Sequence, residues 1–485
     1  MGKTINNILY TISYQLLAIL IPFITTPYIS RILGVENIGI YSYTMSIVQY
    51  FMLVAMLGVS DHGNRSIAAK HESRFEISKY FWNIYTIQLS TSICAIAGYI
   101  FICHFLSPQY TYISILQSLY LISCIFDINW FFWGLEKFKI TVTRNFFIKI
   151  ISVILIFWLV KKPTDLPIYV MIMAISTLIS NVILWLFVRK ELIWVRPSTK
   201  EIVRNLKPCL ILFVPLVARS IFVYMDKILL GFLCPITQVG FYENSEKIIL
   251  APTSILTALG TVMLPKLSNL IHKKLFDTGQ YYTQVSMHYI MLLGCGFSFG
   301  IAAIAPVFAP VFFGPEFQEC ADIMKIMAFT IILVGIANVL RTQCLVPRHC
   351  DRVYVFSVIL GAIINLIVDL LLIPRLGAIG ASIGWLMAEL TITLYQSIMA
   401  NRWLPIIQYY KETSIYFLIG GIMFFTLKIL FGDKSPSIII LVTQIIVGSL
   451  LYIFLFLIYC LVNKNSFASK LLLDKIYTIY KKIRG

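Results

Sequence analysis

The segment Ile438–Val462 reads IIILVTQIIVGSLLYIFLFLIYCLV, twenty-five residues without one charged side chain. A helix that crosses the hydrocarbon core of a bilayer, about 30 Å thick, needs about 20 apolar residues. Comparable segments recur along the chain of 485 residues, of which 59% are hydrophobic and 13% are charged. The sequence therefore predicts an all-α, polytopic membrane protein with about 14 transmembrane helices and almost no soluble part.

The limits of the apolar segments define the predicted spans. The first segment is longer than the hydrophobic region of a signal peptide and lacks a small-residue cleavage site, so we expect it to remain as a helix. The predicted spans cover residues 8–32, 38–60, 80–106, 112–134, 141–160, 168–188, 209–233, 241–265, 284–313, 322–346, 353–374, 380–400, 413–432 and 438–462.

An internal repeat relates the first two spans to the seventh and eighth. Arg31-Ile-Leu-Gly34 followed by Ile38-Gly-Ile-Tyr41 resembles Lys227-Ile-Leu-Leu-Gly231 followed by Val239-Gly-Phe-Tyr242. Six helices separate the copies, so both halves are expected to have the same orientation, about an axis along the membrane normal. This predicts two pseudo-symmetric six-helix lobes plus two C-terminal helices.

The repeat suggests a division of the chain into four parts. We assign residues 1–190 to an N-terminal six-helix lobe, 191–400 to a C-terminal six-helix lobe and 401–462 to helices 13 and 14. The last part, 463–485, has apolar residues at helical spacing with lysines between them. This pattern is typical of a basic amphipathic helix on the inner leaflet, with a disordered tail as the alternative.

The positive charge is distributed unevenly across the predicted spans. The chain has 39 Lys and Arg against 22 Asp and Glu, a net charge of +17. With a cytoplasmic N-terminus, the inner segments hold about 27 Lys and Arg and the outer loops about four, as the positive-inside rule requires. We therefore expect a multi-pass protein of the inner (plasma) membrane with both termini in the cytoplasm, and no nucleic-acid partner.

Several classes of activity find no support in the sequence. No predicted outer loop exceeds about ten residues, which leaves little room for the acceptor site of a glycosyltransferase or polymerase. The chain has no P-loop and no C-x-x-C pair, and most of its ten cysteines fall within spans, where a thiol behaves as a small apolar group. We expect a protein that is not an enzyme and has no cofactor, no metal site and no catalytic residue.

Two arginines are candidates for binding an anionic substrate. Arg219 lies near the middle of the seventh predicted span, where a charge needs a wet cavity or a partner. Its guanidinium either binds a phosphate-bearing headgroup or forms a buried pair with Asp226 or Glu389. Arg31, at the outer end of the first span, either guides a phosphate or simply sits at the interface.

Two stretches near the inner ends of spans each allow two interpretations. Asn64 and Arg65 belong to a predicted polar turn after the second span, which either meets substrate from the cytoplasm or caps a helix. The aromatic stretch Trp130-Phe-Phe-Trp133 fits an interfacial belt better than a platform for stacking sugars.

Five further charged residues within spans fall in the seventh and eighth. We interpret them as a structural charge network between these helices, with proton or sodium coupling as the alternative. A further acid lies close to the midplane of the twelfth span. The candidates for a coupling or charge network are Asp226, Lys227, Glu243, Glu246, Lys247 and Glu389.

Three motifs resemble those of the Wzx-type polysaccharide flippases, whose superfamily also contains the MATE drug exporters and the MurJ-like lipid flippases. The motifs are the stretch Thr26–Tyr41, which reads TPYISRILGVENIGIY, the loop with Gly63-Asn-Arg65, and Asp226-Lys-Ile-Leu-Leu-Gly231 followed by Val239-Gly-Phe-Tyr-Glu243. In number and order of helices the resemblance covers nearly the whole chain.

The resemblance implies a flippase that works by alternating access. It would translocate undecaprenyl-pyrophosphate-linked oligosaccharide repeat units across the bacterial inner membrane for O-antigen, capsule or exopolysaccharide synthesis. Such flippases are expected to present a cationic cavity, and Arg219 fits that role. The implied partners are the polyprenyl-pyrophosphate-linked oligosaccharide, membrane lipid, and a polysaccharide polymerase with other assembly proteins. The alternatives are a cation-coupled MATE-like multidrug exporter, a glycosyltransferase or polymerase, and a scaffold without transport activity.

Overall fold

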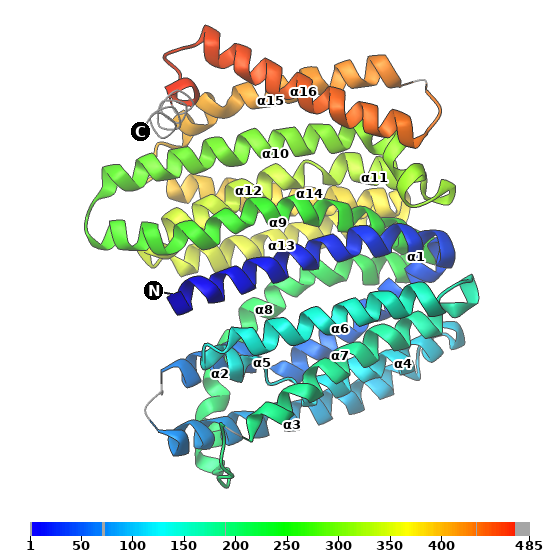
Figure 1. Ribbon diagram of the computed structural model, residues 1–485, viewed down its shortest axis with the longest axis vertical. Helices are drawn as coiled ribbons and strands as arrows, with labels where there is room; N and C mark the ends of the chain where they lie inside the picture. Colours follow the sequence, from blue (N-terminus) through cyan, green and yellow to red (C-terminus); the bar gives the residue numbers. More distant parts are fainter. Residues whose placement is uncertain (1, 70–72, 190, 433, 471–485) are drawn as a thin grey trace. The chain divides into compact units, whose positions relative to one another are not determined.

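The structure is a computed structural model that describes residues 2–69, 73–189, 191–432 and 434–470, with side chains throughout these ranges except at 2–20, 215, 218 and 222. The described residues form helices joined by short connections, with no strand among them (Figure 1). The chain divides into two compact units, residues 1–243 and 244–485. Helix α9 (Ile236–His272) runs from the first unit into the second.

The helices follow the apolar segments of the sequence. In the first unit they are α1 (Gly2–Met56), α2 (Val59–Ala68), α3 (Arg74–Cys103), α4 (Pro108–Ile125), α5 (Asn129–Gly134), α6 (Phe138–Leu159), α7 (Leu166–Val188), α8 (Thr199–Leu233) and the start of α9. In the second they are the rest of α9, α10 (Phe276–Phe312), α11 (Cys320–Met327), α12 (Thr330–Leu340), α13 (Asp351–Leu376), α14 (Ala378–Ala400), α15 (Ile406–Phe431) and α16 (Ile438–Val462).

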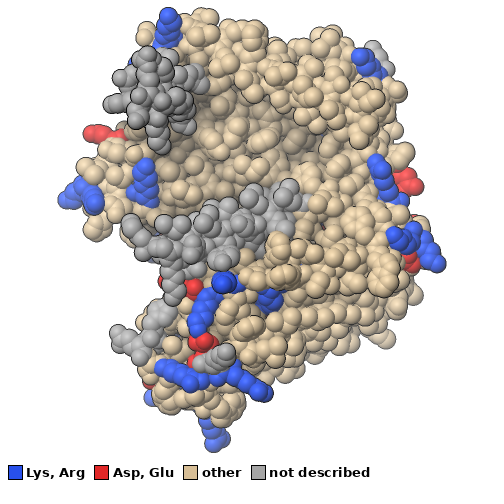
Figure 2. All heavy atoms as spheres, viewed as in Figure 1, with Lys and Arg blue, Asp and Glu red and all other residues tan. Residues whose placement is uncertain are grey.

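The polytopic, all-helical prediction is confirmed. Among the described residues, twelve helices are long and apolar enough to cross a membrane, or up to thirteen if the bent α8 is one span. The first of the twelve, Ile21–Ala68, includes part of predicted span 8–32 and all of predicted span 38–60. Gly34, with φ 75° and ψ 170°, breaks the helical geometry between them. On the face that Figure 2 shows, lysines and arginines lie mostly toward the edges, and much of the surface between them has no charged residue.

Helix α8 is bent in the middle. Its two segments, Thr199–Val214 and Arg219–Leu233, meet at an angle of 47°. In the sequence, Pro215 directly follows the first segment. A proline has no backbone N–H to donate, and sharp helix bends commonly occur at prolines. The bend separates the N-terminal segment of α8, Thr199–Val214, from its C-terminal segment, Arg219–Leu233.

The prediction of an interfacial belt at Trp130–Trp133 is wrong for three of its four residues. Trp130, Phe131 and Phe132 are completely buried, and only Trp133 is partly exposed. Trp130 stacks on Phe81 with ring centroids 5.4 Å apart, because α5 turns inward and packs against α2 and α3. The aromatic stretch is therefore part of the core of the first unit.

The predicted polar turn at Asn64 and Arg65 is also wrong, because both residues lie inside α2. A Cβ atom added at Gly63 would lie 2.4 Å from Cε3 of Trp130, so only glycine allows α2 to approach the buried ring. This contact fixes the position of α2 against α5.

In the second unit, close helix contacts again depend on small residues. A Cβ at Gly384 of α14 would lie 1.9 Å from Oδ1 of Asp369 on the neighbouring α13. The described start of the predicted tail also packs inward: Phe467 stacks on His288 of α10, with ring centroids 4.9 Å apart. Most of the predicted amphipathic helix, residues 471–485, lies outside the described residues.

Candidate functional site

The two copies of the predicted repeat meet in the first unit. A Cβ at Gly39 would lie 2.1 Å from the carbonyl oxygen of Ile236, and a Cβ at Gly240 would lie 2.3 Å from that of Val35. The two contacts are reciprocal, because Val35 and Ile236 have the same offset in sequence as Gly39 and Gly240. Such a contact is what a local two-fold axis produces. α1 and α9 therefore cross at equivalent glycines, with their backbones in close contact.

An ion pair lies one turn from this crossing. Nζ of Lys227 on α8 is 2.6 Å from Oε2 of Glu243 on α9, and the Ser42 hydroxyl on α1 donates to the same oxygen at 2.7 Å. The side chains of Lys227 and Glu243 are only 11% and 13% exposed. These three residues connect α1, α8 and α9, so they join α8 to the two helices of the glycine crossing.

A second polar contact joins α8 to α9. The Tyr242 hydroxyl donates to Oδ2 of Asp226 at 2.5 Å, and both residues are buried. A buried carboxyl group is stable only with such partners. Asp226, Lys227 and Glu243 of the predicted charge network are thus brought together with Ser42 and Tyr242.

Arg219 occupies a different environment from its neighbours on α8. It is the first residue after the bend, and its side chain is exposed. In the part of the chain that the structure describes, its guanidinium makes no ion pair with Asp226. The adjacent backbone is tied to α1, because the Tyr50 hydroxyl donates to the carbonyl of Ser220 at 3.1 Å. Arg219 is therefore available to an anionic ligand.

The other predicted substrate residues lie at opposite ends of the first unit. Arg31 is exposed on α1, close to the break at Gly34. Asn64 is half-buried on α2, where its carbonyl oxygen approaches Gly134 of α5. Arg65 is exposed and lines a pocket of about 380 Å³ between α2, α3 and α8. The structure does not bring these residues together with Arg219 into one cluster.

Three predicted network residues belong to the second unit. Glu246 and Lys247 lie on α9; Glu246 is buried and Lys247 is half-buried. Glu389 is buried on α14. Each of the three has an interaction partner. Among the described residues, no group of three or more His, Cys, Asp or Glu could hold a metal ion.

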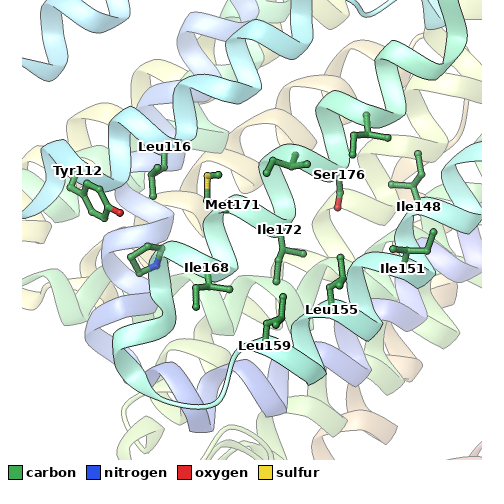
Figure 3. Close-up of a pocket in the computed structure, with 13 residues that line it drawn as sticks. Tyr112, Leu116, Ile148, Ile151, Leu155, Leu159, Ile168, Met171, Ile172 and Ser176 are labelled. Atoms are coloured by element: carbon green, nitrogen blue, oxygen red, sulfur yellow. The ribbon is translucent and has the colours of Figure 1, made fainter.

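An apolar pocket of about 540 Å³ opens between α4, α6 and α7 (Figure 3). None of its thirteen lining residues is charged, and most are isoleucine or leucine, such as Ile151, Leu155 and Ile168. Its one serine, Ser176, accepts a hydrogen bond from Ser152 at 2.7 Å. This pocket suits a lipid chain and offers nothing to a charged headgroup.

Sequence reasoning missed several residues that complete these sites. Ser42 could have been found, because it occupies the position of Glu243 when the two repeats are aligned. Arg204 and Asn205, which line the pocket beside Arg65, carried no such signal. They belong to a basic loop and helix start in which no residue stands out.

The chain matches the family described as "Polysaccharide biosynthesis protein" over residues 4–271, more than half of its length. A "Putative O-antigen transporter" from Shigella dysenteriae is 28% identical over 383 residues, 78% of this chain and 94% of the relative. "Lipid II flippase MurJ, inward closed conformation" has a similar fold, with a TM-score of 0.76 and 14% identity over 93% of this chain and 99% of that one.

A second solved structure has a more distant version of the fold. The inward-facing conformation of a multidrug resistance MATE family transporter gives a TM-score of 0.56 and 11% identity, over 86% of this chain and 100% of that one. The predicted resemblance is confirmed, because the Shigella relative is an O-antigen transporter and the solved structures share the fold. The match over residues 4–271, more than half of the chain, shows that this protein belongs to the family described as "Polysaccharide biosynthesis protein".

Proposed function

We propose that this protein is a flippase that moves undecaprenyl-pyrophosphate-linked oligosaccharide repeat units from the cytoplasmic to the outer leaflet of the bacterial inner membrane. The observation that carries the proposal is the similarity to a Shigella O-antigen transporter along 78% of the chain. The fold shared with a lipid II flippase supports it. In this proposal both termini are cytoplasmic, no covalent bond is made or broken, and a polymerase consumes the product.

The charges of the first unit suggest how the headgroup crosses. The exposed Arg219, beside the bend of α8, can offer bidentate hydrogen bonds to a diphosphate. It lies near the middle of its predicted span, where such a headgroup would have to cross. The buried Lys227–Glu243 pair holds α8 against α9 on the outer side of that position. Breaking this ion pair would leave two charges in a medium of low dielectric, which is costly. During alternating access, α8 and α9 would therefore move together unless that cost is met.

Export of lipid-linked glycan in living cells tests the proposal. A strain lacking the gene is complemented with wild type, Arg219→Ala, or Lys207→Ala, which removes an exposed charge from the inner part of the same helix. We expect the empty strain and Arg219→Ala to strand full-length repeat units on the cytoplasmic leaflet, with surface polysaccharide restored by wild type and Lys207→Ala. Normal surface polysaccharide in the deletion strain would overturn the flippase.

The rival transport activity is a cation-coupled multidrug exporter. The fold similarity to the MATE transporter favours it, although the TM-score is lower than that for the lipid II flippase. An exporter would confer drug resistance on overexpression and leave surface glycan unchanged on deletion. Purified protein that joined sugar units would instead indicate a polymerase.

A further inference from the structure

The pocket between α2, α3 and α8 has a positively charged wall. Arg65 comes from α2 and Arg204 from the N-terminal segment of α8, and both side chains are exposed. In the described ranges neither guanidinium forms an ion pair. The volume of the pocket, about 380 Å³, falls within the range of small-ligand sites, about 300–1,000 Å³. The pocket can therefore hold an anion between two arginines that come from different helices.

The one acidic side chain in the wall does not cancel this charge. Oε1 of Glu201 accepts from Nζ of Lys79 at 2.6 Å, and Oε2 accepts from the Asn83 amide at 2.9 Å. Both carboxylate oxygens thus have partners on α3. With Lys79 counted, the described groups around the pocket carry two positive charges more than negative ones, from Arg65 and Arg204.

The neutral part of the wall is held in place by hydrogen bonds. The side-chain amide nitrogen of the buried Asn205 donates to the backbone carbonyl oxygen of Glu201 at 2.8 Å. The side-chain amide oxygen of Asn205 therefore points toward His62. That oxygen lies 2.9 Å from Nε2 of His62, so the imidazole donates through Nε2 and keeps Nδ1 for another partner. α2 itself is fixed by the contact of Gly63 with Trp130. This wall is built before any ligand arrives.

We propose that this pocket binds the phosphate or diphosphate group of a membrane lipid at the cytoplasmic end of the first unit. Guanidinium groups recognise phosphate oxygens with paired hydrogen bonds. Arg65 and Arg204 supply two guanidinium groups to this pocket, and His62 also lines it. The cytoplasmic placement rests on the proposed function and its orientation. The binding chemistry itself does not require flipping.

The position on α8 gives the pocket a role in loading. Arg204 and Arg219 are fifteen residues apart on one helix, about 22 Å along its axis, with the bend between them. A headgroup held at Arg204 is thus on the same helix as the exposed arginine deeper in the membrane. The pocket captures the anionic headgroup before Arg219 receives it.

Binding to purified full-length protein in detergent tests the proposal. The probes are undecaprenyl diphosphate, undecaprenol, which lacks phosphate, and phosphatidylglycerol. We expect the double variant Arg65→Ala/Arg204→Ala to bind undecaprenyl diphosphate at least about tenfold more weakly than wild type, since each arginine contributes charged hydrogen bonds. Undecaprenol should bind weakly and equally to both proteins. Lys207→Ala, outside the pocket, is the matched control.

The phosphatidylglycerol arm identifies the source of the phosphate. A loss confined to undecaprenyl diphosphate assigns the pocket to the lipid-linked substrate, and an equal loss for phosphatidylglycerol assigns it to an anionic phospholipid headgroup. Unchanged affinity of the double variant for both lipids overturns the site. Arg65→Lys/Arg204→Lys, which keeps the charge but not the paired geometry, should bind at an intermediate level, and melting temperatures verify that each variant is folded.

Failure of this site and failure of the flippase give different results. If the double variant binds phosphate as wild type does and gene deletion still abolishes glycan export, the pocket is not a phosphate site and the proposed function stands. If the double variant binds phosphate more weakly but deletion of the gene leaves surface glycan normal, the pocket is a lipid site and the protein is not the flippase.

Discussion

The two segments of α8 use their charged residues in opposite ways. In the C-terminal segment, Lys227 is buried against Glu243 and Asp226 is buried against Tyr242. In the N-terminal segment, Arg204 is exposed and faces a pocket. A buried charge must be paired because its desolvation is costly, whereas an exposed arginine remains solvated and free to exchange water for a ligand. The comparison separates charges that hold helices together from charges that can bind substrate.

The largest expected effect comes from breaking the buried ion pair. Glu243→Ala removes the carboxylate that lies 2.6 Å from Nζ of Lys227 and should destabilise the protein by about 3–5 kcal/mol. Thermal unfolding of the purified protein measures the change. The control is Asp322→Ala, because the Lys325–Asp322 pair is exposed and should contribute little. Similar melting temperatures for both variants would contradict the role assigned to the C-terminal segment of α8.

The glycine crossing should give the next largest effect. Gly39→Ala and Gly240→Ala each place a methyl group against a backbone carbonyl oxygen, which cannot move aside as a flexible side chain can. We expect each to cost about 1–3 kcal/mol and to reduce glycan export. Gly421→Ala on α15 is the matched control, because a Cβ there meets nothing within 4 Å. If all three substitutions behave alike, the close approach of α1 and α9 is not required.

A smaller effect distinguishes the two equivalent tyrosines of the repeat. Tyr242→Phe removes the hydrogen bond to the buried Asp226 and should cost about 1–2 kcal/mol. Tyr41→Phe removes only a 3.4 Å contact with the Tyr120 hydroxyl and should cost less. Melting temperatures of the two variants, which lose the same atom, provide the comparison. Equal losses would mean that Asp226 does not depend on Tyr242.

The smallest expected effect belongs to the N-terminal segment of α8. Arg204→Ala should leave the free energy of unfolding unchanged within about 0.5 kcal/mol, because an exposed side chain without an ion pair stabilises little. The same melting experiment measures it. A loss as large as that of Glu243→Ala would show that Arg204 is structural and would remove the contrast between the segments.

The successes and failures of prediction follow the range of the interactions involved. The helical membrane fold and the family resemblance are confirmed, because both depend on patterns local in sequence. The belt at Trp130–Trp133 and the turn at Asn64 and Arg65 were wrong, since α5 folds back onto α2 and buries three aromatic rings. Local composition could not reveal this contact. The roles of Arg31, Arg65 and Arg219 in substrate binding stay predictions.

The sequence by itself determined that this protein spans a membrane, where its helices lie and which positions correspond in its two repeats. It could do so because a bilayer requires long apolar helices, and an offset of 201 residues is a property of the chain alone. Only the tertiary structure decided that Glu243 pairs with Lys227 and Ser42, that Gly39 and Gly240 cross, and that Arg204 faces a pocket with Arg65. Those pairings depend on the rotation and packing of helices distant in sequence, which hydrophobicity along the chain does not specify.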